Sequence, residues 1–171
     1  MINKIGLKII TMFGVGKIKK APGTAASFVT TVIYFLLFIS EIPISVIFLI
    51  FFILLIFSIN LIDKNLGNFS KNDPKEIVID EFLGQSIPCI LICFKLKAYN
   101  MFGYQASSPI MDSVIPFFIA FATFRIFDIF KPYPINVVDK KIHNGFGIIF
   151  DDILAGIYSA ITTYLILYII Y

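Results

Sequence analysis

The sequence closes on Gly147–Tyr171, GIIFDDILAGIYSAITTYLILYIIY, and this stretch decides the fold. Residues 153–171 contain no charged side chain, while Asp151 and Asp152 stand immediately before them. A helix that crosses a bilayer needs about 20 consecutive, mostly apolar residues. The stretch therefore predicts a membrane helix that carries two carboxylates at its head.

The composition of the chain agrees with a membrane environment. Hydrophobic residues make up 58% of the 171 residues and charged residues 15%, whereas soluble domains have about 45–50% apolar and about 25% charged residues. This apolar excess is too large for the core of one small soluble domain. We therefore expect a single membrane-embedded domain over residues 1–171, with the lipid bilayer and no nucleic acid as its partner.

Four further stretches are candidates for helices. Residues 24–40 and 44–62 are uncharged and only three residues separate them, so they predict a helical hairpin. Residues 77–94 and 114–130 are apolar but carry charges, and are either spans with polar ends or helices buried against the others. Together with 153–171 they predict an all-α integral membrane helical bundle of about five helices.

The distribution of lysines predicts the orientation. The lysine-rich regions are the N-terminal segment (Lys4, Lys8, Lys17, Lys19 and Lys20), the 63–76 linker (Lys64, Lys71 and Lys75) and the 131–147 linker (Lys131, Lys140 and Lys141). With five helices these three regions lie on one side, and the other side receives only Lys95 and Lys97. Because basic loops favour the cytoplasmic side, we expect the N-terminus to be cytoplasmic.

Acidic residues concentrate at that same predicted side. The sequence NDPKE at 72–76 is typical of a helix start, which would place Asp80 and Glu81 about two turns into the helix. Asp128 shares a helix face with Arg125, near the point where Pro132 should end that helix. With Asp151 and Asp152, five carboxylates from three helices should meet at one membrane depth.

Such a cluster predicts a metal site. Each acid at the bilayer centre costs about 2.5–3.5 kcal/mol, and the carboxylates also repel one another, so a divalent cation would offset both effects. Ligands that are all oxygens favour Mg²⁺ over Zn²⁺. The alternative is a set of ordinary charges at the membrane interface. The candidate catalytic and metal-binding residues are Asp80, Glu81, Asp128, Asp151 and Asp152.

Two loops with small residues precede predicted helices and suggest phosphate binding. KKAPGTAAS at 19–27 and HNGFG at 143–147 could present backbone N–H groups to an anion, although both could also be ordinary turns. The candidate phosphate-binding residues are Lys20, Gly23, Thr24, Arg125, Lys131 and His143. His143 could instead serve only as a hydrogen-bonding loop residue.

The chain resembles the phosphatidylglycerophosphatase A family. The resemblance rests on GVGKIKKAPGT at 14–24, EIVIDEFLG at 76–84, FRIFDIFKPYP at 124–134 and GFGIIFDDILAG at 145–156. It implies a Mg²⁺-dependent phosphatase that converts phosphatidylglycerophosphate to phosphatidylglycerol in phospholipid biosynthesis. It also implies a helical protein of the bacterial cytoplasmic (inner) membrane, with the active site at the cytoplasmic face.

Other functions compete with this interpretation. Membrane acids also occur in cation transporters, although here they gather at one face and no inverted repeat is evident. A CDP-alcohol phosphotransferase also uses Mg²⁺, but the chain contains no Asp-Gly pair. A non-enzymatic assembly subunit would not need clustered acids. Within the phosphatase interpretation, either a carboxylate attacks phosphorus directly or a carboxylate activates a water bound to the cation.

Overall fold

The structure, a computed structural model, describes residues 4–66, 75–101, 109–142 and 144–170. Five long helices form most of it: α2 (Pro22–Ile39), α3 (Ile44–Asn65), α4 (Ile79–Met101), α5 (Pro109–Phe130) and α7 (Gly145–Ile170). Three short ones accompany them: α1 (Lys4–Ile10), the 3₁₀ helix η1 (Met12–Lys17) and α6 (Ile135–Lys141). The all-α prediction is confirmed, and the expected five helices correspond to the long ones among eight helical segments in the described residues.

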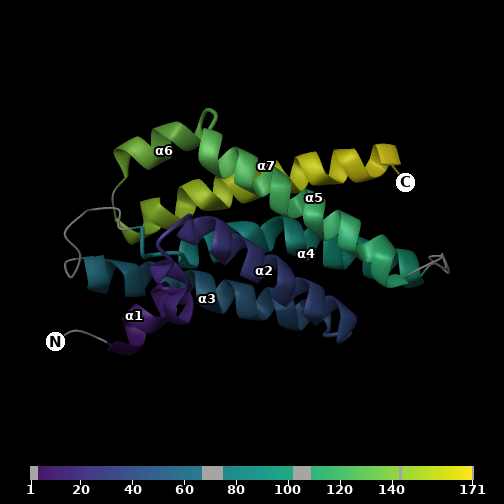
Figure 1. Ribbon diagram of the computed structural model, residues 1–171, viewed down its shortest axis with the longest axis horizontal. Coiled ribbons are helices and arrows are strands. Elements are labelled where there is room, and N and C mark those ends of the chain that lie inside the picture. Colours follow the sequence, from purple (N-terminus) through teal and green to yellow (C-terminus); the bar gives the residue numbers. More distant parts are fainter. Residues whose placement is uncertain (1–3, 67–74, 102–108, 143, 171) are drawn as a thin grey trace.

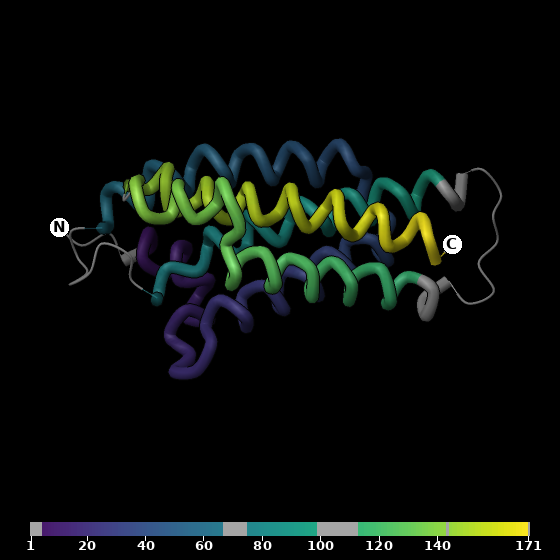
Figure 2. The backbone as a smooth tube through the Cα atoms, turned by 90° about the horizontal axis from the view of Figure 1, so that it is seen from above, coloured from purple at the N-terminus to yellow at the C-terminus, as the bar shows by residue number. Residues whose placement is uncertain are grey.

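The long helices run side by side along the length of the molecule (Figures 1 and 2). α2, α4 and α7 begin, and α3 and α5 end, at the end where the short helices α1, η1 and α6 lie (Figure 1). We call this the α6 end of the bundle. The topology therefore brings the helix ends that flank the lysine-rich regions to one end of the molecule.

Four of the long helices are long and apolar enough to cross a membrane: α2, α3, Ser113–Phe130 of α5, and α7. α4 does not meet that criterion, and it is the helix that packs against all four others. Its Gln85 and Ser86 are fully buried in that position. A helix surrounded by protein does not need an apolar surface toward lipid, which explains why the charged 77–94 stretch belongs to α4.

α4 starts later than the sequence indicates. The expected helix start at 72–76 is wrong, because α4 begins only after that stretch and Asp80 and Glu81 lie in its first turn, not two turns in. The backbone N–H of Val78 donates to the carbonyl of Ile10 at 2.9 Å, and this contact holds the preceding chain outside the helix. Asp73 and Pro74, which the NDPKE pattern suggests as the cap and the first helical residue, lie outside the described residues.

Two glycines let α4 and α7 approach closely just beyond the acids. A Cβ atom on Gly156 of α7 would lie 2.3 Å from the carbonyl oxygen of Gly84 in α4, and a Cβ on Gly84 would lie 2.6 Å from the carbonyl oxygen of Asp152. Small residues allow this backbone contact in membrane helix pairs. Since Glu81 lies one turn before Gly84, the close packing brings the carboxylates of both helices together.

Adding one carbon at this contact should loosen the bundle. We expect Gly156→Ala to lower the free energy of unfolding by about 1–3 kcal/mol, the usual cost of overpacking. The reason is that the new methyl group meets the backbone carbonyl of Gly84, which cannot move aside as a flexible side chain would. Thermal unfolding in detergent would measure this loss. Ala160→Val, a half-buried position one turn further along α7, is the control, and equal stability of both variants would contradict close packing at Gly156.

Candidate active site

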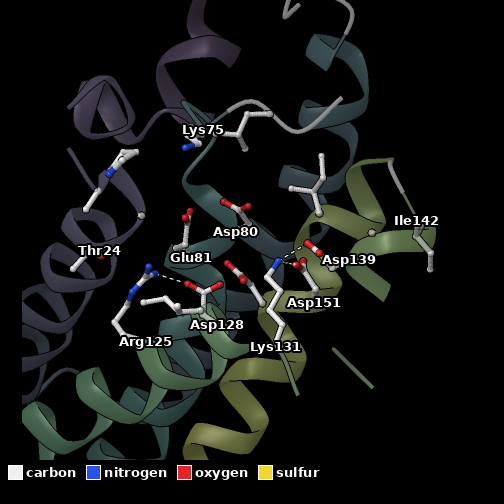
Figure 3. Close-up of a pocket in the computed structure, with 18 residues that line it drawn as sticks. Thr24, Lys75, Asp80, Glu81, Arg125, Asp128, Lys131, Asp139, Ile142 and Asp151 are labelled. Atoms are coloured by element: carbon white, nitrogen blue, oxygen red, sulfur yellow. Dashed lines mark hydrogen bonds and ion pairs between the residues drawn. The ribbon is translucent and has the colours of Figure 1, made fainter. Parts of the chain in front are cut away.

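A polar pocket of about 370 Å³ opens at the α6 end of the bundle. Its walls come from the start of α2, the start of α4, the end of α5, α6 and the start of α7 (Figure 3). All five predicted carboxylates line it: Asp80, Glu81, Asp128, Asp151 and Asp152. So do four residues of the predicted phosphate-binding set: Gly23, Thr24, Arg125 and Lys131. Segments distant in sequence thus contribute their polar residues to one cavity.

Three of the carboxylates have the spacing of metal ligands. One carboxylate oxygen from each of Asp80, Glu81 and Asp152 lies within 4.8 Å of the others. Asp80 Oδ1 and Glu81 Oε2 are buried without a hydrogen-bond partner among the described residues. Buried charged oxygens without partners are costly. A divalent cation would satisfy them, and the oxygen-only donor set suits a hard cation such as Mg²⁺.

The other two carboxylates of the pocket are paired with basic side chains. Asp128 Oδ2 lies 2.5 Å from Arg125 Nη1, as the three-residue spacing on α5 predicts. Asp151 Oδ2 lies 2.5 Å from Lys131 Nζ (Figure 3). The five acids therefore divide into a cluster of three and two ion pairs beside it. Two basic side chains consequently lie beside the three carboxyl groups of the cluster.

Lys131 is held in place from two directions. α5 ends one residue before it, and its backbone adopts a left-handed φ of 40°, which is unfavourable for a residue with a side chain. Its ammonium contacts Asp151 and also Asp139 of α6, each at 2.5 Å. Burial alone would lower the pKa of Lys131, but the hydrogen bonds and charges of the two carboxylates raise it above its ordinary value. The side chain is therefore a fixed positive charge.

The first turn of α2 forms the opposite wall of the pocket. Ala21 takes a left-handed conformation with φ 49°, Pro22 follows at the start of the helix, and no side chain caps the N-terminus. Gly23 lies so close to Glu81 that a Cβ atom on it would be 2.1 Å from Glu81 Oε1. The positive end of the helix dipole thus faces the pocket and its anions. Arg125 Nη1 also donates to Ser27 Oγ at 3.2 Å, which links α5 to α2.

The structure places some residues differently from the sequence-based expectations. Lys20 is exposed and is not among the residues that line the pocket, whereas Lys75 does line it. His143 lies outside the described residues. Asp139 lines the pocket but is not among the sequence-based candidates, because the pattern of residues 131–147 indicates only a lysine-rich linker. The signal that could have revealed it is the PYP turn at 132–134, which makes room for a short helix that folds back toward α7.

Comparison with known proteins finds similar sequences along nearly the whole chain. The family model described as phosphatidylglycerophosphatase A matches residues 8–167. The chain is 36% identical to phosphatidylglycerophosphatase A of Haemophilus influenzae, over 98% of this chain and 91% of that protein. It is 29% identical to phosphatidylglycerophosphatase A of Escherichia coli, over 90% and 78% of the two chains.

A third relative has a different name. The chain is 32% identical to a putative phosphatidylinositol-3-phosphatase of Bacteroides thetaiotaomicron, over 88% of this chain and 86% of that protein. No solved structure gives a significant match. The family match covers nearly the whole chain, including every element that contributes to the pocket. The chain therefore belongs to the phosphatidylglycerophosphatase A family, a family of phosphatases.

Proposed function

We propose that this protein hydrolyses phosphatidylglycerophosphate to phosphatidylglycerol and phosphate, in a Mg²⁺-dependent reaction at the cytoplasmic face of the bacterial inner membrane. The observation that supports this best is the cluster of Asp80, Glu81 and Asp152 next to two fixed positive side chains. This arrangement offers sites for a divalent cation and for a phosphate monoester in one cavity. Family membership supports the same reaction.

In this proposal the cluster of three carboxylates holds Mg²⁺. The cation would supply Lewis-acid polarisation of the phosphate and partial neutralisation of its charge. Asp128 and Asp151 complete the set of five acids, and their ion pairs fix Arg125 and Lys131 at the pocket wall. Both basic side chains would then bind phosphate oxygens and stabilise the charge that develops in the transition state.

Asp151 is our candidate for the proton acceptor. Its Oδ2 is paired with Lys131, while its Oδ1 is buried and has no hydrogen-bond partner among the described residues. As water oxygen forms its bond to phosphorus and the ester P–O bond breaks, Asp151 Oδ1 would take the proton of the water. Asp151 would then give this proton to the alcohol oxygen that leaves phosphorus, so its carboxylate returns to the starting state.

The length of α7 supports a position at the depth of lipid headgroups. At about 1.5 Å per residue, residues 151–170 extend about 30 Å, which equals the thickness of the hydrocarbon core. If the C-terminal end of α7 reaches the far boundary of that core, Asp151 and Asp152 lie at the near one. A phosphate on a membrane lipid would be at this same level.

The proposed orientation predicts a labelling pattern. Because the lysine-rich segments favour the cytoplasm, single cysteines at Lys17, Asn68 and Lys140 should be protected from an impermeant reagent in intact cells and labelled after permeabilisation. Each variant is made in a background without Cys89 and Cys93. Labelling of any of the three from outside would contradict the proposed orientation.

The name of the Bacteroides relative suggests a second substrate for comparison. Purified protein in mixed micelles with Mg²⁺ should release phosphate from phosphatidylglycerophosphate with a higher kcat/KM than from phosphatidylinositol 3-phosphate or phosphatidic acid. Equal or higher kcat/KM for phosphatidylinositol 3-phosphate would assign the pocket to that lipid instead. No release from any of the three would reject a lipid phosphatase.

A further inference from the structure

A second cavity, of about 250 Å³, lies between α2 and α5. Its lining is formed by Phe28, Thr31, Val32 and Phe35 of α2 and Val114, Phe117, Phe118 and Phe121 of α5. The one hydroxyl in this lining, Thr31 Oγ1, is satisfied within its own helix, because it donates to the carbonyl of Ser27 at 2.9 Å. We call this cavity the α2–α5 groove. An apolar ligand in this groove would therefore leave no side-chain hydroxyl of the lining without a hydrogen-bond partner.

The groove is open toward the surroundings of the bundle. Phe28, Val32 and Phe118 are 58%, 39% and 67% exposed. Two pairs of aromatic rings bound it along its length: Phe28 with Phe121 at a centroid distance of 6.0 Å, and Phe35 with Phe117 at 5.6 Å. Both helices are candidate membrane spans, so the open side of the groove would face lipid chains.

The helix register joins the groove to the polar pocket. On α2, Phe28 follows the pocket residue Thr24 by four positions, and Thr31 and Phe35 continue the same helix face. On α5, Phe121 precedes the pocket residue Arg125 by four positions, and Phe118 precedes it by seven. At the junction of the two cavities, Arg125 of α5 donates a hydrogen bond to Ser27 of α2. Both cavities therefore lie along the contact between α2 and α5, with the polar one at the α6 end.

We propose that the α2–α5 groove binds an acyl chain of the lipid whose phosphate occupies the polar pocket. From Phe28 to Phe35 the groove extends about 10 Å along the helix axis at 1.5 Å per residue, so it would hold part of an extended hydrocarbon chain. Its direction, from the polar end of the bundle into the apolar part, is that of a lipid in a bilayer. This proposal rests on the proposed function and adds a subsite to it.

Such a subsite would contribute little to affinity. In a bilayer the lipid chains around the protein are as apolar as the groove, so entry of a chain into the groove gains little free energy. The groove would therefore act mainly by orienting the lipid, so that its phosphate lies against Arg125 and Lys131. A diacyl phosphate monoester should consequently be a better substrate than one with chains too short to enter the groove.

The test compares Val32→Trp with Val46→Trp. Val32 lines the groove and is 39% exposed, while Val46 of α3 is 41% exposed and does not line it. Phosphate release is measured for phosphatidylglycerophosphate with two oleoyl chains and with two butyryl chains. We expect Val32→Trp to lower kcat/KM for the long-chain lipid about tenfold, as overpacking of a filled apolar site would, and to leave the short-chain value within about twofold of wild type. Val46→Trp should change neither value.

Three results would overturn the proposal. The two variants could lower the long-chain value equally, Val32→Trp could lower both substrates equally, or the wild type could show no preference for long chains. If Val32→Trp does not fold, Val114→Trp fills the groove from the α5 side and is judged by the same comparison. Failure of the wild type on both lipids would instead reject the proposed function, so the two failures are distinguishable.

Discussion

Asp152→Asn should lower phosphatase turnover by at least about 10³-fold, since loss of a single electrostatic stabiliser already costs about 10²–10³. The substitution keeps the shape of the side chain and removes one charged oxygen from the cluster formed with Asp80 and Glu81. It should also weaken the binding of the cation, and this effect can be measured without an activity assay. The wild type should gain thermal stability on addition of Mg²⁺, as any protein does whose folded form binds a ligand, and Asp152→Asn should lose most of that gain.

Glu41→Gln is the matched control for this prediction. Glu41 is exposed in the turn between α2 and α3, at the opposite end of the bundle. Its variant should keep both turnover and the stabilisation by Mg²⁺. An Asp152→Asn protein that retains the full Mg²⁺-dependent stabilisation would show that the cluster is not the metal site. Retention of wild-type turnover would show that Asp152 takes no part in the reaction.

Lys131→Ala should lower turnover by about one to three orders of magnitude, in the range seen when an electrostatic stabiliser is removed. The ammonium is fixed by Asp139 and Asp151 at the pocket wall, where it would meet a phosphate oxygen. Cation affinity should not fall, because lysine is not a metal ligand and its loss makes the site more negative. The expected result is thus a large loss of kcat with Mg²⁺-dependent stabilisation preserved.

Two further variants separate phosphate binding from a structural role. Lys140→Ala removes an exposed lysine of α6 at the same end of the bundle and should be close to wild type. Asp139→Asn removes one of the two contacts that hold Lys131, and we expect a smaller loss of turnover from it than from Lys131→Ala. If Lys131→Ala had wild-type turnover, Lys131 would be an anchor at the interface, and phosphate binding would fall to Arg125 and the start of α2.

The sequence was sufficient to predict the long helices and the meeting of the acids. The uncharged stretches that became α2, α3 and α7 have the length and hydropathy of membrane spans, and those properties follow directly from composition. With five antiparallel helices, the third and the fifth start on the same side, and Asp80 and Asp152 lie near those two starts. The structure places both in one pocket, so long-range proximity followed from counting spans.

Contacts between short segments could not be predicted in this way. The late start of α4 depends on a backbone hydrogen bond between Val78 and Ile10, and no local pattern reveals such a partner. The pairing of Lys131 with Asp139 depends on α6 folding back after the turn at 132–134. The division of the five acids into a cluster of three and two ion pairs likewise depends on side-chain distances that spacing along a helix does not determine.

Metal dependence of phosphate release is the most direct test of the account. Purified protein is treated with EDTA, exchanged into metal-free buffer and assayed with phosphatidylglycerophosphate in micelles, with and without added Mg²⁺. The account predicts no measurable release without the cation and full recovery when Mg²⁺ is restored, because Asp80, Glu81 and Asp152 present buried carboxylate oxygens that a divalent cation would satisfy. Phosphate release at the full rate in the presence of EDTA would contradict it.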